Sequence, residues 1–210
     1  IQRGLDINYI DSIVQKYNLK NNSRNYYRFC YTNSYETGLL PIIQFLYPEL
    51  KRLQPNIELH LYGSIRDNTN PQLTKMIEQY ISQDGITDHG ICDMDTIIKE
   101  KHTSGFHLNF IDNTKVDSLS IKESIYCDCM PIISNKDCFK ELVGIHFDLS
   151  TEEITSYKKI AQTIHRILLK FETNKHSIND LKNKICSKKN KDSITTIDDI
   201  LTLWDSILFS

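Results

Sequence analysis

Residues 106–133 read FHLNFIDNTKVDSLSIKESIYCDCMPII, and the character of the sequence changes twice along this stretch. Residues 106–110 and 131–133 are short, mainly apolar runs, which are typical of buried strands. Between them, residues 118–127 have the periodicity of a helix, after a polar loop. A strand, a helix and a second strand in this order indicate a βαβ unit of a parallel sheet.

The same alternation of strands and helices continues on both sides of this stretch. Further strands are expected at residues 26–31, 57–62, 86–90 and 144–147, and further helices at residues 39–53, 71–82 and 93–102. Pro48 should bend or interrupt the helix in which it lies. The sequence therefore predicts an α/β fold, a Rossmann-like doubly wound parallel sheet of about six strands with C-terminal helices.

The C-terminal part of the chain is expected to be helical. Apolar residues recur every three or four positions from Ile154 to Phe171, and again from Ile197 through Trp204 to Leu208. We interpret the basic run between them, residues 182–191, as a solvated linker. The chain is thus divided into a Rossmann-like domain, residues 1–150, and a helical extension, residues 151–210, that packs on it or on a further domain.

Composition excludes several classes of protein. A formal net charge of −2 argues against nucleic acid or an anionic membrane as the main partner, and no apolar run is long enough for a transmembrane segment. The six cysteines follow no disulfide framework, which favours reduced thiols and a cytoplasmic location. We expect Cys127 and Cys129 to be buried thiols rather than metal ligands.

A first candidate binding loop, residues 32–38, follows the expected strand 26–31. In open α/β sheets, ligands bind beyond the carboxyl ends of the strands. Asn33, Ser34 and Thr37 offer polar side chains for a phosphate or a sugar, and Gly38 allows close backbone approach. The same polar side chains could instead cap the following helix.

A second candidate loop, residues 113–120, leads into the helix that carries Glu123. Free backbone N–H groups at Ser118, Leu119 and Ser120 would favour a diphosphate. The Glu123 carboxylate could accept two hydrogen bonds from a ribose diol, or it could be an ordinary acid on a helix surface.

Other ionisable residues allow further interpretations. The pair Asp93 and Asp95 could chelate a metal–diphosphate, although Asp93 also suits the N-cap of a helix, and we expect no metal or other cofactor. His107 and His146 could line a cleft, but structural histidines are more common.

These segments match a known pattern. Residues 117–125 and 129–134 resemble the donor-site helix and strand of retaining GT-B glycosyltransferases, in which a Glu-Ala or Glu-Ser pair precedes a strand that begins with proline. Residues 1–6 resemble the interdomain connector of those enzymes, and residues 34–40 with 55–63 resemble their first helix and second strand. The resemblance covers about residues 1–150 and implies the C-terminal, donor-binding domain.

The resemblance also implies roles for individual residues. Glu123 would bind the nucleotide ribose, residues 118–120 would hold the diphosphate, and the loop at His89 and Gly90 would flank the base. The substrate would be a nucleotide-diphosphate sugar, the acceptor stays unknown, and no metal would be needed. Because the chain begins at Ile1 rather than Met, we expect a fragment, with a Rossmann-like domain before it in the full-length protein.

Two departures from the family pattern leave other functions open. Thr37 stands where the family commonly has a basic residue, and Lys115 stands where many members have a second glutamate. Lys115, Lys122 or Arg66 could supply the missing positive charge. A glycosyltransferase is the leading hypothesis; a non-catalytic nucleotide-sugar-binding or scaffolding domain is the alternative, and a nucleotide-sugar epimerase is the third.

Overall fold

A computed structural model describes residues 4–21, 23–66, 70–110, 119–135, 142–148, 154–200 and 202 of the chain. Six parallel strands form one sheet in the order β3-β2-β1-β4-β5-β6. The strands are β1 (Asn25–Tyr31), β2 (Glu58–Leu61), β3 (Ile86–Asp88), β4 (Ser104–Asn109), β5 (Met130–Ser134) and β6 (Ile145–Phe147). Strand order reverses between β1 and β4, so the sheet is doubly wound and the predicted fold class is confirmed.

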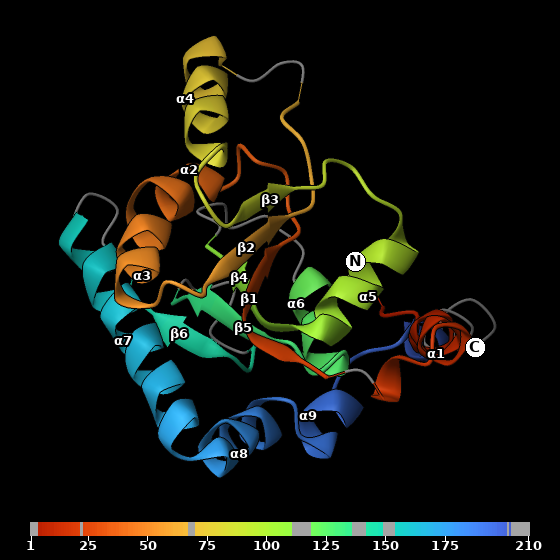
Figure 1. Cartoon of the computed structure of the whole chain (residues 1–210). Coiled ribbons are helices and arrows are strands. Elements are labelled where there is room, and N and C mark those ends of the chain that lie inside the picture. Colours follow the sequence, from red (N-terminus) through yellow and green to blue (C-terminus); the bar gives the residue numbers. More distant parts are fainter. Residues whose placement is uncertain are drawn as a thin grey trace.

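Helices cover both faces of this sheet (Figure 1). One face carries α2 (Leu39–Pro41), the π-helix η2 (Ile42–Leu46), α3 (Tyr47–Leu53), α4 (Pro71–Ile81), α7 (Ile154–Thr173) and α8 (Lys175–Ile185). The other carries α1 (Ile7–Lys16), the 3-10 turn η1 (Leu19–Asn21), α5 (Met94–Thr103), α6 (Leu119–Tyr126) and the short α9 (Lys188–Asp192). No helix of the described part of the chain is long and apolar enough to span a bilayer.

The two faces of the sheet differ in chemistry. On the face under α3 and α7, β1, β2 and β4 contribute apolar side chains such as Phe29, Leu59 and Phe106 to one large core. On the other face, the same strands contribute polar side chains such as His60 and His107, which lie under α5 and α6. Burial of polar groups is costly unless they are hydrogen-bonded, so these side chains need partners within the second face, beside the apolar cluster under α1, α5 and α6.

The helix expected at residues 39–53 is broken as predicted, but one turn earlier than Pro48. The π-helical turn η2 ends at Leu46, and Pro48 lies in the first turn of α3. In a regular helix the Pro48 ring would meet the carbonyl of Gln44, four residues earlier. The widened π turn accommodates this position and keeps both halves packed on the sheet.

Helix α1 was not predicted from the sequence. Asp6 is its N-cap and accepts a hydrogen bond from the backbone N–H of Tyr9 (2.9 Å). Ile10, Ile13 and Val14 are buried on the face that packs against α5. A cap followed by apolar residues at helical spacing was a usable signal, because it meets the ordinary criteria for a helix start.

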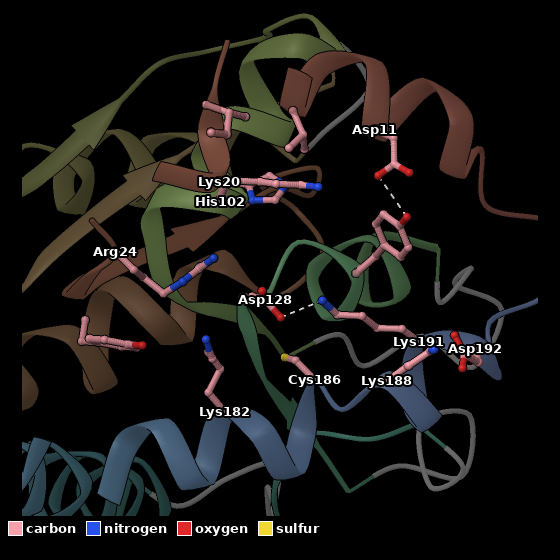
Figure 2. A pocket seen from close by; sticks show the side chains of 14 residues that line it. Asp11, Lys20, Arg24, His102, Asp128, Lys182, Cys186, Lys188, Lys191 and Asp192 are labelled. Atoms are coloured by element: carbon pink, nitrogen blue, oxygen red, sulfur yellow. Dashed lines mark hydrogen bonds and ion pairs between the residues drawn. The ribbon is translucent and has the colours of Figure 1, made fainter. Parts of the chain in front are cut away.

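The interpretation of residues 182–191 as a solvated linker is wrong. This run comprises the end of α8 and all but the last residue of α9, whose N-cap Ser187 accepts from the backbone N–H of Asn190 (3.2 Å). Ile178 and Ile185 anchor α8 in the core, because charged residues on one side of a helix do not prevent burial of the other. Lys182, Lys188 and Lys191 line a cavity (Figure 2).

The close approach of the loops after β1 and β2 requires a glycine at position 63. A Cβ atom added to Gly63 would lie 2.4 Å from the backbone oxygen of Asn33. We expect Gly63→Ala to lower the free energy of unfolding by about 1–3 kcal/mol, since the backbone must shift to relieve this overlap. Urea unfolding measures the change. Ser64→Ala, one residue away, is the control, and equal stability of the two variants would contradict the prediction.

Candidate functional site

A cavity of about 290 Å³ lies at the carboxyl edge of the sheet. Its walls come from the segments that follow the first three strands: residues 32–34 after β1, residues 62–66 after β2, and Ile91 and Cys92 after β3, with Ile97 of α5. This is the edge at which doubly wound sheets bind their ligands. Asn33 and Ser34, two of the predicted residues, line it directly.

The first candidate loop is a turn whose polar side chains do not cap the next helix. Gly38 is the N-cap of α2 and adopts the left-handed conformation (φ 110°). No side chain makes a cap hydrogen bond there. The Thr37 hydroxyl donates within the loop to the carbonyl of Ser34 (2.6 Å). The backbone N–H of Tyr35 donates to the carbonyl of Ser64 (3.1 Å), which ties the loop to the segment after β2.

Two residues on the cavity wall carry hydrogen-bond donor groups. The amide Nδ2 of Asn33 is buried without a hydrogen-bond partner among the described residues, so a donor is left unsatisfied there. Arg66 also lines the cavity, and its Nε lies 2.9 Å from Glu36 Oε1 while 72% of its side chain stays exposed. Two other residues were expected to be able to supply the positive charge that is missing at Thr37. Lys122 is buried on α6, and Lys115 lies outside the described residues.

A hydrogen-bond chain runs beneath the cavity, where β1 meets β4. The Thr32 hydroxyl lies 3.1 Å from His107 Nε2 and 2.8 Å from Ser120 Oγ. On its other side, His107 Nδ1 lies 2.8 Å from Ser124 Oγ. His107 is fully buried, and burial, followed by the charge of Lys101, holds its pKa well below the usual value. His107 is therefore a neutral structural histidine and does not line the cavity.

Glu123, the predicted ribose ligand, forms a buried ion pair with Lys101. Lys101 Nζ lies 2.6 Å from Glu123 Oε2, and the two side chains are 0% and 10% exposed. The same ammonium donates to the carbonyl oxygen of Ser120 (2.9 Å) and to its hydroxyl (3.0 Å). The sequence reading missed Lys101 because it lies on a different helix, and no local pattern indicates a pair that forms only on folding.

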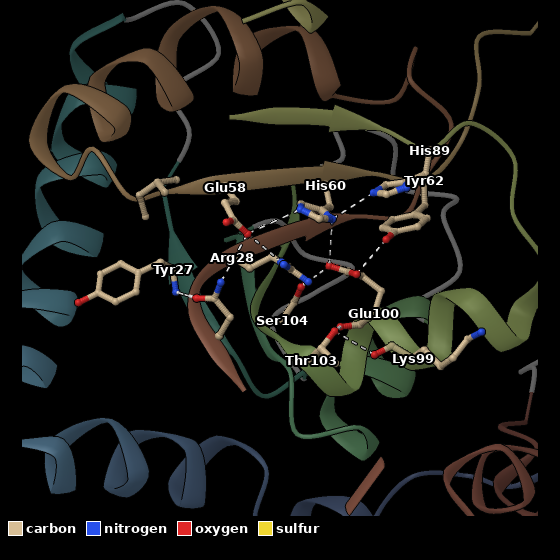
Figure 3. A network of polar contacts seen from close by, with 12 residues as sticks. Tyr27, Arg28, Glu58, His60, Tyr62, His89, Lys99, Glu100, Thr103 and Ser104 are labelled. Carbon is tan, nitrogen blue, oxygen red and sulfur yellow. Dashed lines mark hydrogen bonds and ion pairs between the residues drawn. The ribbon is translucent and has the colours of Figure 1, made fainter. Parts of the chain in front are cut away.

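His89 and Gly90, predicted to flank a base, directly follow β3, and Figure 3 shows His89 beside Tyr62. The His89 ring stacks on the ring of Tyr62 (centroids 4.5 Å apart, planes at 3°), and Tyr62 is itself a wall of the cavity. Gly90 adopts a positive φ of 64°, and its carbonyl accepts from the N–H of Gly63 (2.9 Å). The two residues thus support the cavity rather than face into it.

The layer behind Tyr62 is a second polar network (Figure 3). The Tyr62 hydroxyl donates to Glu100 Oε2 (2.8 Å), and the Ser104 hydroxyl donates to Glu100 Oε1 (2.5 Å). His60 Nδ1 lies 3.0 Å from His89 Nε2 and 3.7 Å from Glu100 Oε1. Burial lowers the pKa of His60, although the Glu100 carboxylate opposes this effect. The network fixes the ring of Tyr62 and therefore the shape of the cavity.

The acidic pair Asp93 and Asp95 has partners within the protein. Asp93 caps α5 through the backbone N–H of Thr96 (2.8 Å), as predicted. Asp95 accepts from the Tyr9 hydroxyl (2.5 Å) and from Lys16 Nζ (3.1 Å). Within the described ranges, no three His, Cys, Asp or Glu side chains gather as a metal site would require.

The remaining candidates either do not line the cavity or lie outside the described residues. His146 is on β6, where its Nε2 lies 2.8 Å from the carbonyl of Leu142. Cys127 and Cys129 are buried free cysteines, as predicted, and burial raises the pKa of Cys127 to about 12. Ser118 lies outside the described residues, while Leu119 and Ser120 form the first described turn of α6.

The ion pair of Lys101 and Glu123 should be essential for stability. We expect Lys101→Met to lower the free energy of unfolding by about 3–5 kcal/mol, because the Glu123 carboxylate is then buried without its partner. Chemical denaturation measures this loss. The double variant Lys101→Met/Glu123→Leu should lose less than the single variant, since no unpaired charge remains. A double variant that is less stable than Lys101→Met would contradict this explanation.

Neutral His107 should make the fold sensitive to acid. Its pKa is lowered in the folded state from the ordinary 6.5, so its contribution is complete above pH 6.5 and is lost as pH falls below that value. We expect His107→Gln to flatten the pH dependence of unfolding free energy between about pH 6.5 and 5, by up to ~1.4 kcal/mol per pH unit. The exposed His176→Gln is the control, and identical slopes for both variants would contradict the assignment.

Comparisons with known proteins find similarity at the level of the fold. No family model and no curated protein sequence matches the chain. Among solved structures, it is similar to HepE from Anabaena in complex with UDP and glucose (TM-score 0.66, 11% identity), covering 97% of this chain and 55% of that one. It is also similar to the pneumococcal O-GlcNAc transferase GtfA in complex with UDP and GlcNAc (TM-score 0.63, 14% identity), covering 99% of this chain and 37% of that one.

A third neighbour is WaaG, a glycosyltransferase of lipopolysaccharide biosynthesis (TM-score 0.61, 10% identity, covering 97% of this chain and 52% of that one). This chain therefore spans about half, or less, of the length of these neighbours. Identities this low establish similarity of fold. The resemblance found in the sequence is confirmed at that level: the chain has the Rossmann-like fold of a GT-B glycosyltransferase domain.

Proposed function

We propose that this chain is the donor-binding half of a glycosyltransferase, which holds a nucleotide-diphosphate sugar at the carboxyl edge of its sheet. The observation that carries the proposal is the cavity beside the reversal of strand order, with the unsatisfied Asn33 amide and the exposed Arg66 guanidinium on its wall. Both groups are hydrogen-bond donors, and the guanidinium is cationic, so an anionic ligand suits them.

The structural neighbours support this choice of ligand. The HepE and GtfA structures contain UDP together with a sugar. At about 290 Å³ the cavity is near the lower end of the range for small-molecule sites, roughly 300–1,000 Å³, as expected when another part of the protein supplies the second wall. The acceptor would bind on that other part.

In this proposal, Arg66 replaces the basic residue that is absent at Thr37. Glu36 holds the guanidinium at the cavity without burying it. A cation there would stabilise the diphosphate as the sugar leaves, which is the largest electrostatic demand of the reaction. The start of α6, where Ser120 Oγ lies 2.8 Å from the Thr32 hydroxyl, would lie near the diphosphate.

Glu123 could bind a ribose only in a restricted way. Its side chain is only 10% exposed and its Oε2 atom already accepts from Lys101, so a ribose hydroxyl would donate to Oε1 or to the remaining lone pair of Oε2. His89 and Gly90 would lie near the base, through the Tyr62 ring that His89 supports. The Lys101–Glu123 pair would then serve to orient the carboxylate as well as to stabilise the fold.

A second candidate function is a non-catalytic nucleotide-sugar-binding or scaffolding domain. The observation in its favour is that the Thr37 hydroxyl is used within its own loop, where a catalytic cation would be expected. Both functions require donor binding, and only the first requires sugar transfer or donor hydrolysis.

Calorimetric titration with a panel of UDP- and GDP-sugars tests the proposal. We expect saturable binding of at least one donor, and a loss of about tenfold or more in affinity for Asn33→Ala and for Arg66→Gln, since each removes a donor to a charged ligand. Asn33→Ala breaks no protein hydrogen bond of Nδ2, so the fold should be unaffected.

Arg52→Gln is the matched control, because Arg52 is also an exposed arginine paired with a glutamate, Glu49, but lies on α3. Binding that is unaffected by Asn33→Ala and Arg66→Gln, or absent for the whole panel, would refute the donor site. Donor hydrolysis or transfer by the longer polypeptide separates an enzyme from a binding domain.

A further inference from the structure

A second and larger cavity, of about 680 Å³, lies at the amino edge of the sheet, opposite the candidate donor site (Figure 2). Arg24 precedes β1, His102 is in the last turn of α5, and Asp128 lies between α6 and β5, so the strands begin here. Helices α1, α8 and α9 complete the wall. Its volume is within the range, roughly 300–1,000 Å³, that small organic ligands occupy in proteins.

The charges on this wall are unusual for the chain. Five cations line the cavity with three carboxylates: Lys20, Arg24, Lys182, Lys188 and Lys191, with Asp11, Asp128 and Asp192. The wall is therefore positive by two charges, although the whole chain is negative by two. Such a local excess of cations attracts anions into a recess.

Structural roles account for only two of the five cations. The Arg24 guanidinium donates to the carbonyls of Lys101 (2.9 Å), Ser104 and Cys127 (2.7 Å), and so holds the starts of β4 and β5 together. Lys191 pairs with Asp128 (2.8 Å). Even so, the charge of Arg24 is not neutralised by any carboxylate among the described residues.

The other three cations have no acceptor among the described residues: Lys20 from η1, Lys182 from α8 and Lys188 from α9. In Figure 2, Lys182 projects from α8 toward Arg24. His102 Nε2 is buried without a partner, and burial lowers the pKa of His102 to about 4, so its ring is neutral. A bound molecule could satisfy all of these groups.

We propose that this cavity binds a small phosphomonoester whose organic body carries hydroxyl groups. A phosphate ester has a charge of about −1.5 to −2 at neutral pH, which matches the excess of two positive charges. Lysine ammonium groups bind phosphate as point charges. Asp11, Asp192 and the neutral His102 are suitable partners for hydroxyl groups, and the walls of Tyr26 and Tyr126 provide apolar surface for the carbon skeleton.

Calorimetry with sorbitol 6-phosphate, sorbitol and inorganic phosphate as probes tests the proposal at one fixed salt concentration. The protein should carry Arg66→Gln, so that anion binding at the carboxyl edge is reduced. We expect one saturable event for sorbitol 6-phosphate, at least about tenfold tighter than for either of the other probes, since both the phosphate and the hydroxylated body contribute.

The double variant Lys20→Gln/Lys182→Gln should weaken this binding by about tenfold or more without loss of thermal stability, since neither side chain has a partner among the residues that the structure describes. Lys75→Gln/Lys170→Gln is the matched control, because it removes two exposed lysines from α4 and α7. Equal binding of sorbitol 6-phosphate and inorganic phosphate, no binding at all, or equal losses in the two double variants would overturn the proposal.

Discussion

The buried ammonium group of Lys101 is the constraint from which the arrangement of the second sheet face follows. A fully buried cation must be neutralised and hydrogen-bonded, and Glu123 and Ser120 of α6 provide both functions. Because Lys101 belongs to α5, this contact ties two helices together over β1 and β4. It thereby fixes the start of α6 at the point where strand order reverses.

The same helix-to-helix contact links the fold to the proposed chemistry. Ser120 extends the network to Thr32, which is also a wall of the carboxyl-edge cavity. The cavity is thus supported from below by buried, directional interactions, while the amide of Asn33 has no hydrogen-bond partner among the described residues and the Arg66 guanidinium stays exposed; these are the two groups that we propose bind the ligand. Rigid support beneath exposed donors is the arrangement that preorganises a binding site.

The sheet separates two polar recesses of different character. The carboxyl-edge cavity is small, with Arg66 as the cation on its wall, whereas the amino-edge cavity has more than twice the volume and an excess of positive charge. Arg24 contributes both to the fold and to the charge of the second cavity. Its guanidinium donates to carbonyls at the starts of two strands, and no carboxylate among the described residues neutralises its charge. A chain of nearly balanced composition can therefore present strongly localised charge.

The sequence determined the order of the six strands and of the helices between them, because periodicity and short apolar runs are local properties that need no knowledge of contacts. It also determined the Asp93 cap, the burial of Cys127 and Cys129, and the family resemblance of residues 117–134. It placed Asn33 and Ser34 at the carboxyl edge of the sheet, where ligands bind in this class of fold, since that follows from strand direction alone.

Only the tertiary structure decided that Lys101 reaches Glu123, that His107 is a buried neutral residue in a hydrogen-bond chain, and that the basic run of residues 182–191 forms helices around a cavity. Those outcomes depend on side chains that are far apart in the sequence and meet only when burial forces every polar group to find a partner.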